Sequence, residues 1–170
     1  EIPPYEVSCS KGKVVVSGSV DRVDEAVING KKYVRIIDYK SSGKDFELSD
    51  VMQGLNMQML IYLFALWQNG SEKLGEFTPA GVLYQSAKSP IVSVDRGTND
   101  ATVEKEIQKK CGMTGIILND VDVVIAMDEN LSGLYAPAKI TKGALSGSLI
   151  GLKQLEKLKE RADKILTEMA

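Results

Sequence analysis

Two aspartates and a lysine lie close together in the first quarter of the chain. Asp38 and Lys40 end an apolar run that begins at Val34, and Asp21 precedes that run by the length of one short hairpin. Carboxylate oxygens are the ligands that hard divalent cations prefer in proteins. A lysine beside such a cation can orient a metal-bound water or help to deprotonate it. These residues therefore predict metal-dependent hydrolysis of phosphodiesters.

The dipeptide Asn29-Gly30 predicts how these residues are arranged. A two-residue type I′ turn needs positive φ at both central positions, which Asn and Gly tolerate. If this dipeptide is the turn of a hairpin, Asp21 lies opposite Asp38, with Cβ atoms about 5 Å apart on one face of the sheet. Lys40 points to the same face, because side chains alternate along a strand.

The same register pairs Asp24 with Arg35 on the other face, which is ordinary sheet electrostatics. Like charges directly opposed across two strands destabilise the pairing, so Asp21 and Asp38 require a compensating group. A bound divalent cation is one interpretation, and a solvated surface pair is the other. Lys40, in register with both carboxylates, favours the cation site.

A long apolar segment follows the hairpin and predicts a buried helix over residues 51–69. Ser49 or Asp50 can cap its first turn, and Gly70 is a stop signal just beyond its end.

Three residues of this predicted helix, Gly54, Gln58 and Tyr62, recur every four positions and share one stripe. The glycine would permit the close approach of another backbone. Gln58 and Tyr62 can be read as the polar edge of a core helix or as part of the site that the aspartates begin, and their company favours the site.

Three groups of residues resemble the motifs of RecB-type PD-(D/E)XK nucleases. Residues 18–24 resemble the pattern G-x-(I/V)-D-R-(I/V)-D, residues 36–41 contain D-x-K, and residues 58–62 contain Q-x-x-x-Y. Residues 79–84 and 112–115 agree with the same family. Over nearly its whole length, the chain more narrowly resembles the C-terminal nuclease domain of the B-type (AddB or RexB) component of the bacterial ATP-dependent helicase-nucleases.

The resemblance implies a fold, a catalytic set and a cofactor. The fold would be α/β, a restriction-endonuclease-like core with a mixed central β-sheet flanked by helices. The two aspartates and one backbone carbonyl would bind Mg²⁺ or Mn²⁺, the lysine would be catalytic, and the glutamine and second tyrosine would position the lysine, water or scissile phosphate. The implied residues, in chain order, are Asp21, Asp38, Tyr39 (through its backbone carbonyl), Lys40, Gln58 and Tyr62.

Two ligand types common among these relatives differ in this chain. Many RecB-type nucleases have an upstream histidine ligand, and this chain contains no histidine. The AddB/RexB relatives also carry a four-cysteine iron–sulfur cluster, whereas this chain has Cys9 and Cys111 alone. A cluster needs about four thiolates, so we expect it in a full-length parent and not in this chain. We interpret both cysteines as buried small hydrophobes or free thiols.

The composition predicts one domain over residues 1–170, which we expect to be a fragment excised from a longer chain. The chain is 44% hydrophobic and 26% charged, enough for a sizeable core. It has no apolar run of membrane length, so no membrane partner is expected, and a cytoplasmic location is. No phosphate-binding loop of the G-x-x-x-x-G-K-(S/T) type is present, which argues against ATPase chemistry in this chain.

A net charge of −2 and a pI near 5.3 argue against a dedicated high-affinity nucleic-acid binder. DNA contacts would then be local, from Lys40, Lys44 and the loop 41–45. Lys31 and Lys32 at the hairpin tip are interpreted as solvated turn residues rather than as DNA contacts.

The remaining segments are interpreted as scaffold. One or two strands are predicted within residues 7–20 and another over 81–85. A helix is predicted from Thr98 or Asp100 to about Lys110, and a second hairpin from segments 115–118 and 121–127 joined by Asn119-Asp120. An amphipathic helix is predicted over 152–169, with an apolar face formed by Leu155, Leu158, Ala162, Ile165, Leu166 and Met169.

These observations predict a metal-dependent deoxyribonuclease domain of a helicase-nuclease that processes DNA ends for recombinational repair. Its partners would be DNA, single-stranded by preference, and the A-type component of the complex. Two alternatives remain: a nuclease-like structural or DNA-guiding module that is inactive as an isolated fragment, and a metal-binding module without hydrolytic function.

Overall fold

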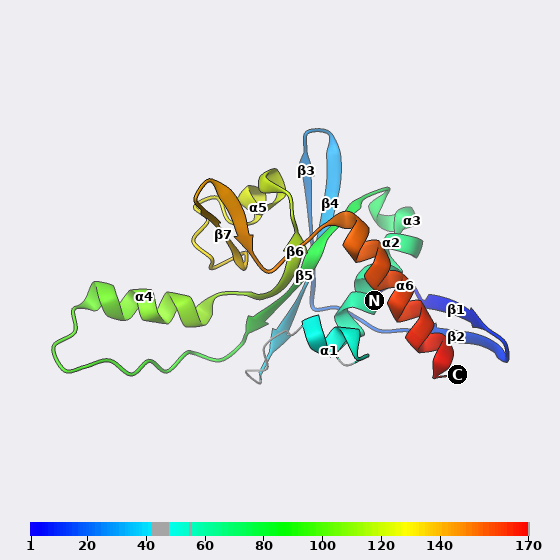
Figure 1. Cartoon of the computed structure of the whole chain (residues 1–170), viewed down its shortest axis with the longest axis horizontal. Coiled ribbons are helices and arrows are strands. Elements are labelled where there is room, and N and C mark those ends of the chain that lie inside the picture. Colours follow the sequence, from blue (N-terminus) through cyan, green and yellow to red (C-terminus); the bar gives the residue numbers. More distant parts are fainter. Residues whose placement is uncertain (42–47, 55, 170) are drawn as a thin grey trace.

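A mixed β-sheet forms the centre of the computed structural model, which describes residues 1–41, 48–54 and 56–169 (Figure 1). Within these residues the sheet has five strands in the order β3-β4-β5-β6-β9. β4 is parallel to β5 and β6 is parallel to β9, whereas the other neighbours are antiparallel. The α/β class with a mixed central sheet is thereby confirmed. The strands are β3 (Arg22–Ile28), β4 (Lys31–Lys40), β5 (Thr78–Ser86), β6 (Thr114–Leu118) and β9 (Leu149–Ile150).

The predicted hairpin between β3 and β4 is confirmed, including its turn and register. Asn29 has φ 51° and Gly30 has φ 75°, as a type I′ turn requires. Asp24 lies opposite Arg35 in the ladder, and their side chains form an ion pair with 3.0 Å between nitrogen and oxygen.

One face of the sheet is covered by two helices and a small hairpin. The helices are α2 (Gln58–Asn69) and α6 (Leu152–Glu168), and the hairpin joins β1 (Tyr5–Cys9) to β2 (Gly12–Val16). Ile36 of β4 and Val82 of β5 are fully buried against this layer. The segment 7–20 thus contributes parts of two strands, which pair with each other rather than with the central sheet.

The opposite face is covered by α5 (Val121–Met127) and by a hairpin of β7 (Ala138–Thr141) and β8 (Ala144–Gly147). Ile37 of β4 and Leu83 of β5 are buried in this second layer together with Val124 of α5. Neighbouring residues of β4 therefore belong to different cores, as strand alternation requires.

The single helix predicted over 51–69 is wrong, because two helices separated by a turn occupy this region. α1 (Leu48–Met52) contains Ser49 and Asp50 within it rather than as caps, and α2 begins at Gln58. Between them Gly54 has φ 83° and Asn56 has φ 53°, which a helix cannot accommodate. Gly54 therefore serves a turn and does not share a helical stripe with Gln58 and Tyr62.

The end of α2 agrees with the prediction, since the helix stops at Asn69 and Gly70 caps it through a bond to the Leu66 carbonyl. A single-turn helix, α3 (Ser71–Leu74), follows directly.

The second hairpin predicted around Asn119-Asp120 is also wrong, because its second segment is the helix α5. The Asp120 side chain accepts hydrogen bonds from the amides of Asp122 and Val123 and so caps that helix. The apolar run that reads as a strand packs its helical face on β6 and β3 instead.

The two remaining helices match their predicted positions. α4 (Asp100–Cys111) is capped by Asn99, between the two caps considered from sequence. The apolar face of α6 buries Leu155, Leu158, Ala162 and Leu166, whereas Met169 is 78% exposed. Across the described ranges, no helix combines the length and apolarity needed to span a bilayer.

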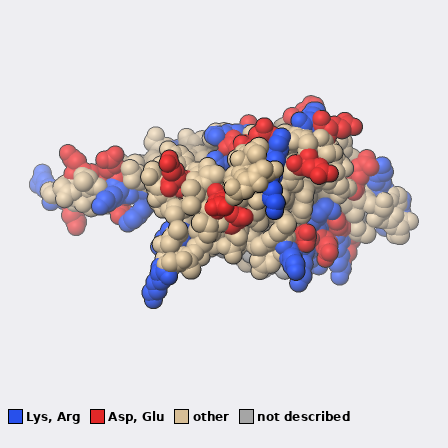
Figure 2. Space-filling view, turned by 90° about the horizontal axis from the view of Figure 1, so that it is seen from above, with Lys and Arg blue, Asp and Glu red and all other residues tan. Residues whose placement is uncertain are grey.

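The segment from the end of β5 through α4 projects from the body of the molecule (Figure 1). No residue of α4 is buried, and its Lys105, Lys109 and Lys110 are exposed, as predicted for a solvated helix. On the face shown in Figure 2, acidic and basic side chains are interspersed, so that face carries no broad field of one sign.

A buried carboxylate organises the loop after α5. Asp128 is 3% exposed and accepts hydrogen bonds from the Ser132 hydroxyl and from the amides of Gly133, Leu134 and Tyr135. Burial alone would raise the pKa of Asp128, but the bonds from Ser132 and the backbone outweigh that effect and hold the pKa below its usual value.

Asp128→Ala is expected to lower the free energy of unfolding by about 2–4 kcal/mol, because several buried donors lose a charged acceptor. Urea unfolding measures this loss. A lowered folded-state pKa stabilises the protein above the unfolded value of about 3.9 and ceases to do so as pH falls through the folded value. The stability gap between the wild type and Asp128→Asn should therefore shrink below about pH 4, and a gap that is constant with pH would contradict the assignment.

Candidate active site

Asp38 and Lys40 lie at the C-terminal end of β4, on the face that packs against α2. The preceding residue on this face, Ile36, is fully buried, whereas Asp38 and Lys40 are partly exposed. β-Branched residues at positions 34, 36 and 37 favour the strand and bury its centre. The strand therefore carries the charged pair from the core to the edge of that layer.

Asp21 lies beside this pair, immediately before the first residue of β3. The last paired residues of the β3–β4 ladder are Arg22 and Ile37, so Asp21 falls one step beyond them, opposite Asp38 in the same register. Its carboxylate accepts a hydrogen bond from the backbone amide of Tyr39 at 2.9 Å. The two aspartates and the Tyr39 peptide unit are thus brought together, as the turn predicts.

The Asp38 carboxylate combines burial with an incomplete set of partners. Lys40 Nζ lies 2.5 Å from Asp38 Oδ2, and the Lys40 and Asp38 side chains are 39% and 20% exposed. Among the described residues, however, Asp38 Oδ2 has no partner with hydrogen-bond geometry, although that atom is shielded from solvent. A buried anionic oxygen without a directed donor is costly, and a cation bound there would satisfy it.

The donor chemistry around Asp38 and Asp21 suits a hard divalent cation. Both carboxylates and the Tyr39 carbonyl offer oxygen, which Mg²⁺ and Mn²⁺ prefer. In the part of the chain that the structure describes, no three His, Cys, Asp or Glu side chains gather as a metal site. A cation would therefore rely on backbone oxygen and water in addition to the two carboxylates.

Tyr84 is a neighbour of this site that the sequence analysis does not single out. It lies opposite Asp38 in the parallel β4–β5 ladder, and its ring centroid is 5.4 Å from Lys40 Nζ. Burial, and then the nearby charge of Asp38, raise the pKa of Tyr84 to about 12. The sequence shows Tyr84 as one more residue of a buried strand, and only the pairing of β5 with β4 reveals its position.

Gln58 and Tyr62 share one stripe of α2, as predicted. Gln58 Nε2 donates a hydrogen bond to Tyr62 Oη at 2.8 Å, and Tyr62 is 6% exposed. The Tyr62 ring packs against Gly18, where a Cβ would lie 2.8 Å from the ring carbon Cε1 and overlap the hydroxyl end. Gly18 thus allows α2 to bring this pair next to the segment that leads into Asp21.

Gly18→Ala is expected to displace Tyr62 and to lower the free energy of unfolding by about 2 kcal/mol, because overpacked cores must shift to admit a new methyl group. The measurement is urea unfolding of a double-mutant cycle with Tyr62→Ala. In the Tyr62→Ala background the second substitution should cost little, since the obstructing ring is gone. Ser19→Ala, at an exposed neighbouring position, is the control. Equal costs in both backgrounds would contradict the proposed contact.

The predicted DNA-contacting loop is only partly described. Ser41 is exposed, whereas Lys44 and the rest of residues 42–45 lie outside the described residues. Lys32 donates to the Leu74 carbonyl at 2.8 Å and pairs with Glu25, so it holds the hairpin tip to α3. Lys31 is exposed.

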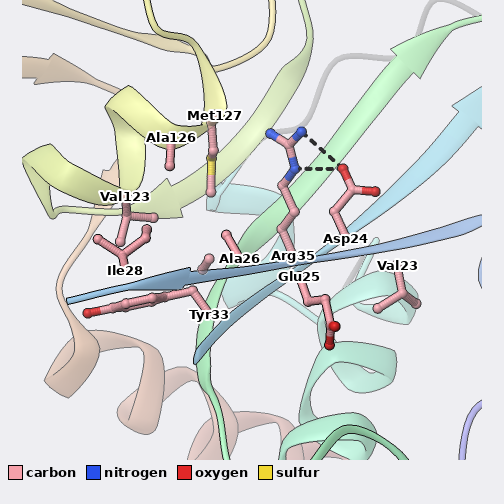
Figure 3. A pocket seen from close by; sticks show the side chains of 11 residues that line it. Val23, Asp24, Glu25, Ala26, Ile28, Tyr33, Arg35, Val123, Ala126 and Met127 are labelled. Carbon is pink, nitrogen blue, oxygen red and sulfur yellow. Dashed lines mark hydrogen bonds and ion pairs between the residues drawn. The ribbon is translucent and has the colours of Figure 1, made fainter. Parts of the chain in front are cut away.

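A hollow of about 410 Å³ lies on the other face of the hairpin (Figure 3). Arg35 and Asp24 point toward each other at one side of it, and Ile28, Val123 and Met127 lie around the other. Because Asp38 and Lys40 occupy the opposite face of β4, this hollow is separate from the candidate site. Elsewhere, Cys9 and Cys111 are free thiols, in agreement with one of the two expectations for them.

The fold and the carboxylate–lysine site define a class of nuclease, and the chain belongs to the PD-(D/E)XK nuclease superfamily, whose family model matches residues 1–170. The motif resemblance is thereby confirmed.

Individual relatives share one description, the B-type component of an ATP-dependent helicase/deoxyribonuclease. The chain is 42% identical to that of Clostridium novyi (strain NT) over 170 residues, covering 96% of this chain and 15% of the relative. It is 46% identical to that of Bacillus anthracis over 135 residues, covering 77% and 12%. It is 37% identical to that of Caldanaerobacter subterraneus subsp. tengcongensis over 177 residues, covering 98% and 15%. The chain thus spans a small part of these relatives.

Proposed function

We propose that this chain is a Mg²⁺- or Mn²⁺-dependent deoxyribonuclease domain that hydrolyses phosphodiester bonds of DNA. The observation that carries the proposal is the buried Asp38 Oδ2, which lacks a hydrogen-bond partner among the described residues and lies beside Asp21 and Lys40. Membership of a nuclease superfamily supports the reaction type.

Asp21, Asp38 and the Tyr39 carbonyl would hold the cation. When bound, a divalent ion in such a site stabilises charge on phosphate oxygens and lowers the pKa of its water. Asp21 is already oriented for this role, because the Tyr39 amide holds one of its carboxylate oxygens and leaves the other to a ligand.

The remaining site residues would bind and orient the reactants. Lys40 places an ammonium group next to Asp38, where it can hold the attacking water or the scissile phosphate. Gln58 and Tyr62 form a hydrogen-bonded pair at the start of α2. We propose that this pair contributes amide and hydroxyl groups to the positioning of the phosphate or of Lys40.

The names of the relatives suggest the larger setting. They are described as components of a helicase/deoxyribonuclease, and we propose that this domain processes DNA ends for recombinational repair within such a complex. The A-type component would be its protein partner, the cytoplasm its location, and single-stranded DNA its preferred substrate. A full-length parent would carry the iron–sulfur cluster that Cys9 and Cys111 cannot build.

The charge of the chain agrees with action as part of a larger machine. Non-specific DNA affinity comes mainly from Lys and Arg that neutralise phosphates, and this chain has a net charge of −2. Tethering to a DNA-bound partner raises the effective concentration of DNA at the site without requiring a basic surface.

Cleavage of end-labelled DNA tests the proposal, with single-stranded and duplex substrates in Mn²⁺, Mg²⁺ or EDTA. We expect metal-dependent cleavage, faster on the single strand and absent in EDTA. Cleavage that persists in EDTA would contradict metal dependence. No cleavage, combined with Mn²⁺ binding that depends on Asp38, would favour the DNA-guiding or metal-binding module over the nuclease.

A further inference from the structure

The Tyr84 ring lies at the centre of the candidate site without being part of the motifs that define it. In the parallel ladder it stands opposite Asp38, two residues after the fully buried Val82. The Lys40 ammonium lies 5.4 Å from the ring centroid. This separation is within the range of about 6 Å at which an aromatic face attracts a cation.

Lys40 has two attractive neighbours, and one of them is also a candidate metal ligand. The Lys40 ammonium contacts Asp38 Oδ2 at 2.5 Å, and the same oxygen is the one left without a hydrogen bond among the described residues. A cation bound to Asp38 would compete with Lys40 for that oxygen. Lys40 is 39% exposed, so a lysine released from Asp38 could extend into solvent and leave the site.

We propose that the Tyr84 ring is a positioning residue that keeps the Lys40 ammonium beside the site when Asp38 binds a cation. The attraction to a ring face does not use the carboxylate, so it persists when Asp38 is engaged. This inference rests on the proposed nuclease function for its purpose, but the contact itself can be tested without it.

The packing of Tyr84 fits it for this role. Tyr84 is partly buried against the core layer that also contains Tyr62 and Val82, so its ring is held on one side by the core. Because the β4–β5 pairing continues to Lys40 and Ser86, the backbone around the ring is fixed by the sheet on both sides of the site.

The contact can be measured through the magnetic effect of the ring on lysine resonances. In protein labelled with ¹³C at lysine Cε, the Lys40 ε-protons should be shifted upfield of those of exposed lysines, with Lys40→Arg used for assignment. The shift should remain in Tyr84→Phe, disappear in Tyr84→Leu, and persist in the wild type after Mg²⁺ is added. An unshifted Lys40 signal, or a shift retained in Tyr84→Leu, would overturn the proposal.

The molecule contains an internal reference for this experiment. Lys159 Nζ also lies 5.4 Å from a tyrosine centroid, that of Tyr5, in a different part of the structure. Its upfield-shifted signals should stay in place in both Tyr84 variants. Loss of the Lys159 shift in Tyr84→Leu would reveal general unfolding, in which case Tyr84→Met, with a longer flexible side chain, replaces it in the same comparison.

Cleavage kinetics separate positioning of Lys40 from binding of DNA. Tyr84→Leu should lower kcat about tenfold with little change in KM, and Tyr84→Phe should recover most of that loss. Tyr135→Leu, which removes a half-exposed ring elsewhere, is the matched control. Equal kcat in the Phe and Leu variants would overturn the role of the ring. If the wild type cleaves no DNA, the proposed function fails, whereas the resonance shifts still decide whether Tyr84 positions Lys40.

Discussion

Asp38→Ala is expected to reduce metal-dependent DNA cleavage by about a thousandfold or more, because it removes a proposed metal ligand and its charge. Mn²⁺ binding, followed by titration calorimetry, should be lost with it. The free energy of unfolding without metal should not fall, since the substitution removes a buried carboxylate that faces Asp21 and has an oxygen without a hydrogen bond. Lys40 is exposed enough to be solvated once Asp38 is gone.

Asp24→Ala provides the matched control for this result. Asp24 belongs to the same hairpin but lies on its other face, paired with Arg35 and Arg22. Its removal should leave cleavage unchanged and lower stability by about 1 kcal/mol. If Asp38→Ala destabilised the metal-free protein clearly more than Asp24→Ala, the electrostatic account of the aspartate pair would be wrong.

Lys40→Met is expected to reduce cleavage by about a thousandfold while leaving metal binding in place. The methionine keeps much of the aliphatic length of lysine but cannot hold a water or a phosphate. Because the ammonium no longer occupies Asp38 Oδ2, the affinity for Mn²⁺ should stay the same or rise. Calorimetry and cleavage assays on the same preparation make the comparison.

The pair of results from Asp38→Ala and Lys40→Met separates the three hypotheses for this chain. A nuclease loses cleavage in both variants and metal binding in the first alone. A metal-binding module without hydrolytic function shows the same binding pattern and no cleavage in the wild type, and a structural module binds no metal at this site. Lys31→Met, at the exposed hairpin tip, controls for the removal of one positive charge, and a similar loss of cleavage there would indicate non-specific DNA attraction instead.

The features predicted correctly from sequence are those decided by nearby residues. Asn29-Gly30 determines its own turn, and the turn determines which residues of the two strands face each other. The position of Asp21 beside the peptide unit of Tyr39 follows from that register. The spacing of Gln58 and Tyr62 on a helix is local in the same sense.

The features predicted wrongly depend on contacts with distant parts of the chain. The segment 121–127 has an alternation that suits a strand, but its side chains find their core on β6 and β3 as a helix capped by Asp120. The apolar run after Asp50 reads as one helix, yet positive φ at Gly54 and Asn56 turns the chain so that α2 starts at Gln58. Tyr84 joins the site through a parallel pairing, which no local pattern announces.

The bond between Tyr5 and Asp163 has a consequence for how this domain is made. The Tyr5 hydroxyl donates to a carboxylate 158 positions later, and its ring is 1% exposed. Chains leave the ribosome at about 5–20 residues per second, so Asp163 emerges on the order of ten seconds after Tyr5. The β1–β2 hairpin therefore waits for the helix that covers it, while the β3–β4 hairpin with Asp21 and Asp38 has all its residues at hand early. During synthesis, the proposed metal ligands are available before the helix that seals the β1 strand.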